Sequence, residues 1–400
     1  MADEIMKMYP EDVMMYMLIR LQVKTLLRLK CVSKTWCALV KSSTFIHFHL
    51  NRTTTAKDEF ILLKRSFEEE PNKYQSTLSF LFDVDDQIDN GPVFSDLDVP
   101  YLTTTSGFMF HQLLGPCHGL ILLTDSESIA LLINPTTRKY RLLTPSTFIC
   151  PLGFYHDIKG VSFGFDSIAN DYKVTSISEV IGDPPFNDLN VREWRVEVYD
   201  LITDSWRDLD HVYQQLPTLW WYPCSEIFYK GSLHWFAATN GTFLILCFDL
   251  STEIFRGMMM PDCCDFFDGK CYGLVVLNES LTLICYPNPV SEPQPGKELT
   301  DVWLMKEYGI NRSWVKKYTI RTLPIESPLV IWRDHVLFLQ SQSGVLISYD
   351  LHYEEVKGYN LQGLPKSFRV AIYKESLIPV PKGSVLGNQV QMYNRDDITL

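Results

Sequence analysis

The chain has 400 residues, of which 46% are hydrophobic, 13% aromatic and 21% charged. This is the composition of a globular protein with a large core, and the length suggests two domains or one large all-β domain with an appendage. Residues 1–50 carry seven Lys or Arg and four Asp or Glu, so of the net charge of −12 the remaining 350 residues carry −15. Such an acidic part suits a basic protein partner better than nucleic-acid phosphates, although acidity also serves solubility alone.

The N-terminus, residues 1–5, has no basic region and no continuous apolar stretch, so we expect no signal peptide. No apolar run approaches the roughly 20 residues that span a bilayer, and we expect no membrane association. The ten cysteines lie scattered, most of them in apolar surroundings. These features favour a reducing compartment, the cytosol or the nucleus, with the cysteines as thiols.

Residues 9–12 predict the start of a helix, with a proline near its first position and two acids at the positive end of its dipole. The apolar residues that follow recur at helical spacing and form one face: Val13, Met17 and Leu21, widened by Met14 and Leu18. A second helix is expected over residues 25–32, and Ser33 is placed to cap a third that contains Trp36. So small a unit buries too little surface to be robust alone, so we expect another protein to cover part of it.

Residues 10–12, 20–28, 30–36 and 43–50 together resemble a plant F-box. The resemblance implies docking to a Skp-type adaptor and, through it, to the cullin and RING protein of a ubiquitin ligase. Three positions depart from the usual pattern: Tyr9, Gln22 and Leu29. By residue type and position we place five residues in the adaptor interface: Pro10, Leu18, Val23, Leu26 and Leu27. Three others fit the domain's own core equally well: Cys31, Val32 and Trp36.

After residue 55 the hydrophobic period becomes strand-like, and one plan recurs: an apolar run, a turn at Asp or Asn, and a short charged return strand. The copies are residues 131–140, 196–207, 248–255 and 347–356, with a divergent copy at 302–318. Several strands in each unit of roughly 50 residues are typical of propeller blades. The predicted fold is therefore mainly β, a three-helix-type F-box followed by a kelch-like β-propeller; an open sandwich or meander is the alternative.

Residues 115–120 and 163–174 most clearly resemble the F-box-associated domain of plant F-box proteins, a kelch-like propeller. The resemblance extends over most of residues 60–375. It implies four parts, which are an F-box at 1–50, a linker at 51–60, a substrate-recognition propeller at 61–375, and a C-terminal strand and polar tail at 376–400.

Segments that interrupt the repeats are candidates for target recognition, because loops on a scaffold usually carry binding residues. One such segment, residues 64–74, contains three consecutive glutamates, and another, residues 83–99, contains six aspartates. We assign target binding to nine acidic residues: Glu68, Glu69, Glu70, Asp83, Asp85, Asp86, Asp89, Asp96 and Asp98.

Three motifs resemble catalytic or metal-binding sites, but the residues around each of them do not fit such a site. Residues 160–164 fit G-x-S-x-G, but a turn and a strand follow where a nucleophile elbow needs a helix. Residues 83–94 begin like a calcium loop, but lack glycine at position six and an acid at position twelve. Cys263, Cys264 and Cys271 lack the paired spacing of a zinc site. We therefore predict no catalytic residue, no cofactor and no metal, and the absence of basic runs with aromatics argues against nucleic acid.

Residues 1–3, 42–46 and 49–55, with the propeller segments, resemble the S-locus F-box proteins of the nightshade family. That resemblance implies a non-catalytic ligase receptor in the pollen-tube cytosol, with the nucleus as a further location. Its targets would be basic, secreted pistil S-ribonucleases of non-self type, marked for degradation in self-incompatibility. Three alternatives stay open: a paralogous receptor for another cytosolic protein, a propeller scaffold without ligase role, and an enzyme built on a propeller.

Overall fold

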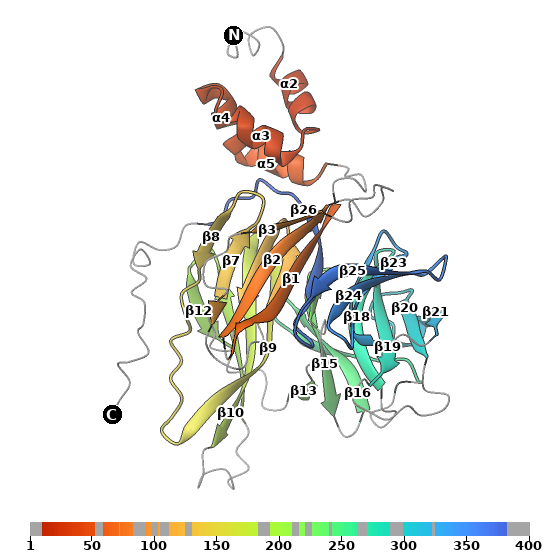
Figure 1. Cartoon of the computed structure of the whole chain (residues 1–400). Coiled ribbons are helices and arrows are strands. Elements are labelled where there is room, and N and C mark those ends of the chain that lie inside the picture. The colour runs from red at the N-terminus through yellow and green to blue at the C-terminus, as the bar shows by residue number, and fades with distance from the viewer. Residues whose placement is uncertain are drawn as a thin grey trace.

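The computed structural model describes residues 10–52, 59–71, 73–82, 93–97, 103–104, 112–124, 130–182, 193–209, 216–220, 226–239, 242–262, 264, 270–288, 299–321 and 325–381. A small helical domain lies at one end of a propeller made of six sheets (Figure 1). This confirms the predicted fold class. No helix in the described ranges is long and apolar enough to cross a membrane.

Within residues 10–52 the N-terminal domain contains four helices: α2 (Glu11–Leu18), α3 (Val23–Leu29), α4 (Lys34–Lys41) and α5 (Ser43–Leu50). Ser33 caps α4 as expected, because its hydroxyl accepts a hydrogen bond of 3.2 Å from the Trp36 amide. Ser42 does the same for the Phe45 amide at 3.2 Å. Residues 43–50 therefore form a helix of their own after α4.

The blades follow one another around the ring. Blade 1 contains β26 (Arg369–Lys374), β1 (Glu59–Glu70), β2 (Lys73–Phe82) and β3 (Val93–Leu97), with β4 (Thr103–Thr104) beside β2. Blade 2 contains β5 (Gln112–Cys117), β6 (Leu120–Thr124), β7 (Ala130–Asn134) and β8 (Lys139–Leu142). Blade 3 contains β9 (Phe154–Asp166), β10 (Asp171–Gly182), β11 (Glu193–Asp200) and β12 (Ser205–Asp208).

Blade 4 contains β13 (Thr218–Trp220) and β14 (Ile227–Tyr229), both paired with β15 (Ser232–Thr239), then β16 (Thr242–Asp249) and β17 (Phe255–Met259). Blade 5 contains β18 (Lys270–Leu277), β19 (Ser280–Pro287), β20 (Thr300–Met305), the short helix η3 (Asn311–Ser313) and β21 (Trp314–Ile320). Blade 6 contains β22 (Ile325–Trp332), β23 (Val336–Ser341), β24 (Val345–Asp350) and β25 (Val356–Gln362).

The ring is closed by strands from the two ends of the propeller. The last strand, β26, pairs antiparallel with the first, β1, in a register that places Ile61 opposite Ile372. This pairing completes blade 1 and closes the ring. Strand β1 begins at Glu59, inside the segment expected to be a linker.

The five predicted sequence copies are the outer strand pairs of blades 2 to 6. Four of their turns, and the β9–β10 turn, begin at an Asp or Asn and have a residue with positive φ four positions later. The pairs are Asn134 and Arg138 (φ 53°), Asp166 and Asn170 (53°), Asp200 and Asp204 (54°), Asp249 and Glu253 (57°), and Asp350 and Glu354 (56°). The side chain of Asp249, for example, accepts hydrogen bonds from the amides of Ser251 and Thr252 at 3.1 and 2.8 Å. Side-chain capping of the turn therefore produces the repeated sequence pattern.

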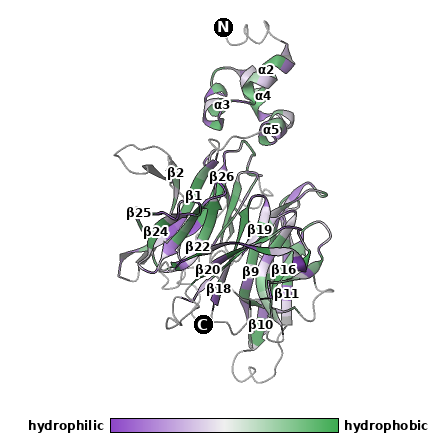
Figure 2. Ribbon diagram, turned by 90° about the vertical axis from the view of Figure 1, so that its right-hand side faces the viewer, coloured by the Kyte–Doolittle hydropathy of each residue, from purple (hydrophilic) through white to green (hydrophobic). Residues whose placement is uncertain are grey.

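Hydrophobic residues gather along the strands (Figure 2) and pack between neighbouring blades. The segment after β26 is different: residues 375–381 form no strand, contrary to the expectation for 376–400, within the part that is described. Leu377 instead packs into the core of the helical domain. The Asn134 amide nitrogen donates to the carbonyl oxygens of Ser376 and Ile378 at 3.1 and 2.7 Å. This segment therefore ties the helical domain to blade 2.

Candidate functional site

The helical domain has its own compact core. Buried side chains from all four helices meet there: Met14, Leu18, Val23, Leu26, Trp36, Val40 and Phe45. His49 is also buried, and its Nε2 lies 3.0 Å from the Leu21 carbonyl oxygen. The domain is thus packed before any partner binds.

One apolar face of α2 stays outside that core. Val13, Tyr16 and Met17 are 40%, 56% and 54% exposed. Their i, i+3, i+4 spacing places them on one side of the helix, and the Arg20 guanidinium stacks 4.0 Å from the centre of the Tyr16 ring. We call these three residues the α2 stripe. An exposed apolar stripe on a small domain is a candidate protein-docking surface.

The five residues predicted to contact an adaptor do not form one surface. Pro10 is exposed and Leu27 is half-buried. Leu18, Val23 and Leu26 are only 3%, 0% and 0% exposed and pack in the core of the helical domain, so their place in the adaptor interface stays a prediction. Of the three residues left open, Trp36 belongs to the core, whereas Cys31 and Val32 are exposed. Burial inside a domain and burial by a partner require the same residue types, which is why the sequence did not separate them.

The nine acidic residues assigned to the target do not converge either. Glu68 and Glu70 are exposed at the end of β1, and Glu69 lies between them, so residues 64–70 are strand and not loop. Asp96 is exposed on β3, where its carboxylate accepts a hydrogen bond of 2.6 Å from Ser79. The other five lie outside the described residues: Asp83, Asp85, Asp86, Asp89 and Asp98.

The face of the propeller away from the helices carries exposed apolar residues. The β9–β10 hairpin has its turn at Asp166–Asp171, on the side of the helical domain, and its open end at Phe154 and Gly182 is at the opposite face (Figure 1). Just before this open end, Ile149 and Leu152 are 86% and 101% exposed, and Tyr155 on β9 is 46% exposed. We call these three residues the far-face patch.

Acidic side chains flank the far-face patch. Asp157 and Glu179 are opposite each other on β9 and β10 and share one cation, Lys159, which lies 3.5 Å from Glu179 and also contacts Asp157. Glu179 is 5% exposed, whereas the Asp157 side chain is 48% exposed beside the apolar residues. The exposed Glu68 and Glu70 lie at the end of β1 that points away from the helical domain.

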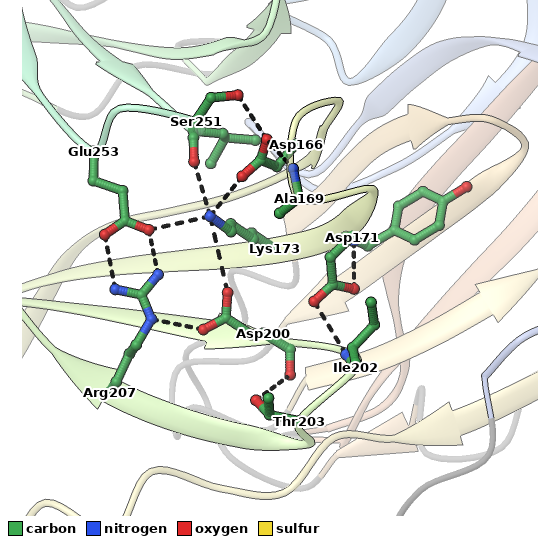
Figure 3. A network of polar contacts seen from close by, with 12 residues as sticks. Asp166, Ala169, Asp171, Lys173, Asp200, Ile202, Thr203, Arg207, Ser251 and Glu253 are labelled. Carbon is green, nitrogen blue, oxygen red and sulfur yellow. Dashed lines mark hydrogen bonds and ion pairs between the residues drawn. The ribbon is translucent and has the colours of Figure 1, made fainter.

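A buried polar network locks blade 3 to blade 4 on the helical side (Figure 3). The Lys173 ammonium on β10 donates to the Asp166 carboxylate at 2.8 Å, to the Leu250 carbonyl at 2.9 Å and to Glu253 at 3.1 Å. Leu250 and Glu253 belong to the β16–β17 turn of blade 4, so one lysine crosses the blade boundary. Lys173 is only 5% exposed.

Arg207 on β12 completes this network. It donates to Asp200 at 2.7 Å and to Glu253 at 2.8 Å. Ser251, from the same turn of blade 4, donates to Asp166 at 2.6 Å. Residues 163–174, which carry the resemblance to the F-box-associated domain, therefore have a structural role: Asp166 and Lys173 connect blade 3 to blade 4.

The charges of the network shift the pKa values of its members. Burial alone would raise the pKa of Asp166, but hydrogen bonds from Lys173, Ser251 and two backbone amides lower it to about 2. Burial opposes the charge of Lys173 as well, yet its hydrogen bonds to Asp166 and Glu253 raise its pKa. Both groups are therefore held charged in the folded protein.

Residues 115–120 carry the second motif of that resemblance. His118 and Gly119 have positive φ values of 51° and 77° in the β5–β6 turn. The His118 ring lies 3.1 Å from the Tyr172 hydroxyl and 4.6 Å from the centre of the Phe165 ring, so it joins blade 2 to blade 3. A Cβ on Gly119 would collide with Ser376, so this turn needs glycine where the C-terminal segment passes.

The axial channel shows no catalytic arrangement among its described residues. A cavity of about 230 Å³ follows the inner strands, and most of its lining is apolar. Its polar members include Gln112, which donates to Glu226 at 3.3 Å, and Ser162. Ser162, the serine of the G-x-S-x-G match, is a buried residue of strand β9. No group of three metal-ligating side chains occurs in the described part of the chain.

The described part of the chain is a small helical domain joined to a closed β-propeller. Two family models match the chain: the F-box associated beta propeller domain over residues 79–376 and the F-box domain over residues 10–48. The chain therefore belongs to the F-box proteins with an F-box-associated β-propeller. An F-box domain implies binding of a Skp-type adaptor in a Skp–cullin–F-box complex.

Curated relatives agree over almost the whole length. F-box protein CPR1 of Arabidopsis thaliana is 26% identical over 401 aligned positions, which cover 94% of this chain and 90% of that protein. F-box protein At3g07870 of the same organism is 25% identical, covering 92% and 91%. Among solved structures, an oligogalacturonate lyase from Vibrio parahaemolyticus aligns with a TM-score of 0.40 at 10% identity, covering 76% of this chain and 79% of that one.

Proposed function

We propose that this chain is a non-catalytic substrate receptor of a Skp–cullin–F-box ubiquitin ligase. The observation that carries the proposal is the α2 stripe, an exposed apolar face on a domain that matches the F-box. The helical domain docks on the adaptor, and the propeller holds a target near the conjugating enzyme. The receptor thereby raises the effective concentration of target lysines without contributing a reacting group.

Binding of a purified Skp-type adaptor to the full chain tests the first half of this proposal. Met17→Glu places a charge in the stripe and should weaken adaptor binding at least about tenfold, since a charge buried without a partner costs several kcal/mol. Thr44→Glu, at an exposed position on α5, is the matched control and should bind normally. If both variants bind the adaptor equally well, the α2 stripe is not part of the interface. If the wild type does not bind the adaptor, the proposed ligase role is wrong.

For the target, we propose a basic secreted S-ribonuclease of non-self type, bound in the pollen-tube cytosol, with the nucleus as a further location. Two features support this narrower proposal: the sequence resemblance to S-locus F-box proteins and the charge of −15 over residues 51–400. Opposite charges steer association and fix orientation, and apolar contacts add affinity.

The far-face patch is the proposed docking surface for the target. It lies at the end of the propeller away from the adaptor-binding helices, so adaptor and target can bind together. Ile149 and Leu152 supply apolar anchors, and the exposed Asp157 on β9 supplies a carboxylate beside them. A basic partner with a small apolar contact fits this combination.

A binding panel of S-ribonuclease variants at low and high salt tests the target. Leu152→Asp should lose affinity at least about tenfold, because a buried contact of this size contributes 1.5–3 kcal/mol or roughly that. Ile168→Asp is the control, because Ile168 is 81% exposed on the opposite face. Binding of the adaptor without any S-ribonuclease would favour a paralogous receptor for another protein, and binding of both without ubiquitin transfer would favour a scaffold.

A further inference from the structure

Two cysteine sulfurs meet at the boundary between blades 4 and 5. The Sγ atoms of Cys264 and Cys285 lie 3.4 Å apart, although the residues are 21 positions apart in the sequence. Cys285 is on β19 and is 1% exposed, within the core shared by the two blades. Cys264 follows β17 in a tight turn, where its amide donates to the Pro261 carbonyl at 2.8 Å.

This distance is that of two thiols in contact. A disulfide has an S–S bond of about 2.05 Å, so the sulfurs must approach by a little more than 1 Å to bond. Cys285 sits in a packed strand and cannot move far, whereas Cys264 lies in a connection between blades and is only half-buried. Cys264 is therefore the residue that moves when the two sulfurs approach each other.

We propose that Cys264 and Cys285 are an oxidative modification site that forms a disulfide across the blade boundary. The oxidant is a hydroperoxide. The Cys264 thiolate attacks the peroxide oxygen, which gives a sulfenic acid on Cys264 and releases an alcohol, or water from hydrogen peroxide. The Cys285 thiol then attacks the sulfenic sulfur, forms the S–S bond and releases water. Two thiols are oxidised and one peroxide is reduced.

The order of these steps follows from burial. Cys264 is the residue that a small oxidant can reach, and Cys285, shielded in the core, acts as the resolving thiol. The resulting bond would join the end of blade 4 to the second strand of blade 5. It would therefore stabilise the boundary that the β17–β18 connection spans, since a cross-link removes freedom from the unfolded chain.

Cys271 is the comparison residue within the same blade. It precedes Tyr272 on β18; Tyr272 packs in the blade 4–blade 5 core, whereas Cys271 packs in the blade 5–blade 6 core. Because side chains alternate along a strand, Cys271 is on the other face of the sheet from Cys285. Cys263 directly precedes Cys264 and lies outside the described residues, so it needs its own control.

The test treats the folded, reduced full chain with hydrogen peroxide, blocks remaining thiols and maps peptides without reduction. We expect a Cys264–Cys285 peptide pair about 2 Da lighter than its two thiol peptides, reversed by dithiothreitol, and a thermal midpoint raised by at least about 2 °C. Cys264→Ser should abolish the pair and the rise, whereas Cys263→Ser and Cys271→Ser should retain both.

Cys285→Ala serves as the second variant. Should it fold, oxidation should stop at a sulfenic acid on Cys264 that dimedone traps; should it not fold, Cys264→Ser alone decides, because its site is half-buried. Cross-links from Cys263 or Cys271 in place of Cys264, or oxidation without any Cys264–Cys285 link, would overturn the proposal.

Discussion

Removing the Lys173 ammonium should destabilise the propeller more than removing any surface lysine. In Lys173→Met the side chain keeps its length, but the carboxylates of Asp166 and Glu253 lose a partner 2.8 and 3.1 Å away inside the blade boundary. Breaking a buried ion pair by removing one member costs about 3–5 kcal/mol. Asp166 keeps its hydrogen bonds from Ser251 and two amides, so we expect the lower end of that range, about 3 kcal/mol.

Urea unfolding of the full chain, followed by tryptophan fluorescence, measures this loss as a lower midpoint at an unchanged slope. Lys139→Met, at an exposed position on β8, is the matched control and should change the free energy of unfolding by less than about 0.5 kcal/mol. Adding Asp166→Asn to Lys173→Met should recover part of the loss, because it removes the stranded charge. A Lys173→Met midpoint equal to that of Lys139→Met would refute the reasoning.

Three further predictions concern other buried contacts. Burial lowers the pKa of His234 to about 4, below its unfolded value of 6.5. The free energy of unfolding should therefore be highest above pH 6.5 and fall by about 3 kcal/mol as the pH drops towards 4. Urea titrations across this pH range should show no such decrease for His234→Asn. Gly119 and Gly231 share a φ of 77°, but of the two only Gly119 would place a Cβ against a neighbouring residue. Gly119→Ala should therefore lower the free energy of unfolding by about 3 kcal/mol, and Gly231→Ala by about 1 kcal/mol. Equal losses in thermal unfolding would contradict the packing argument. Asn134→Asp replaces the donating amide with a carboxylate that faces the carbonyl oxygens of Ser376 and Ile378. The free energy of unfolding should fall by about 2 kcal/mol, and amide hydrogen exchange at residues 376–381 should become faster. Unchanged exchange would contradict the attachment of this segment to blade 2.

Local pattern predicted the repeating part of the fold well. The turn at Asn134, Asp249 or Asp350 is capped by the side chain of that residue, so its signal is short-range and readable in the sequence. The closure of blade 1 is different, because β1 and β26 are separated by almost the whole propeller. No local pattern specifies which distant strand completes a sheet.

The candidate site was harder to predict for two physical reasons. On α2, the residues that pack inside and those that stay outside are all apolar, so periodicity alone placed Met17 and Leu18 on one face, although Met17 is 54% exposed and Leu18 3%. A lysine is normally a surface residue, so nothing local marked Lys173 as a link between blades. The thiol contact between Cys264 and Cys285 likewise depends on the meeting of two blades.

Reconstituted ubiquitin transfer tests the central claim most directly. The full chain, a Skp-type adaptor, cullin, RING protein and conjugating enzyme are combined with a basic S-ribonuclease, and modified S-ribonuclease is measured over time. We expect transfer with the wild type and with the controls Thr44→Glu and Ile168→Asp, and its loss with either Met17→Glu or Leu152→Asp. Transfer that is absent with the wild type, or unaffected by both of these substitutions, would contradict the account.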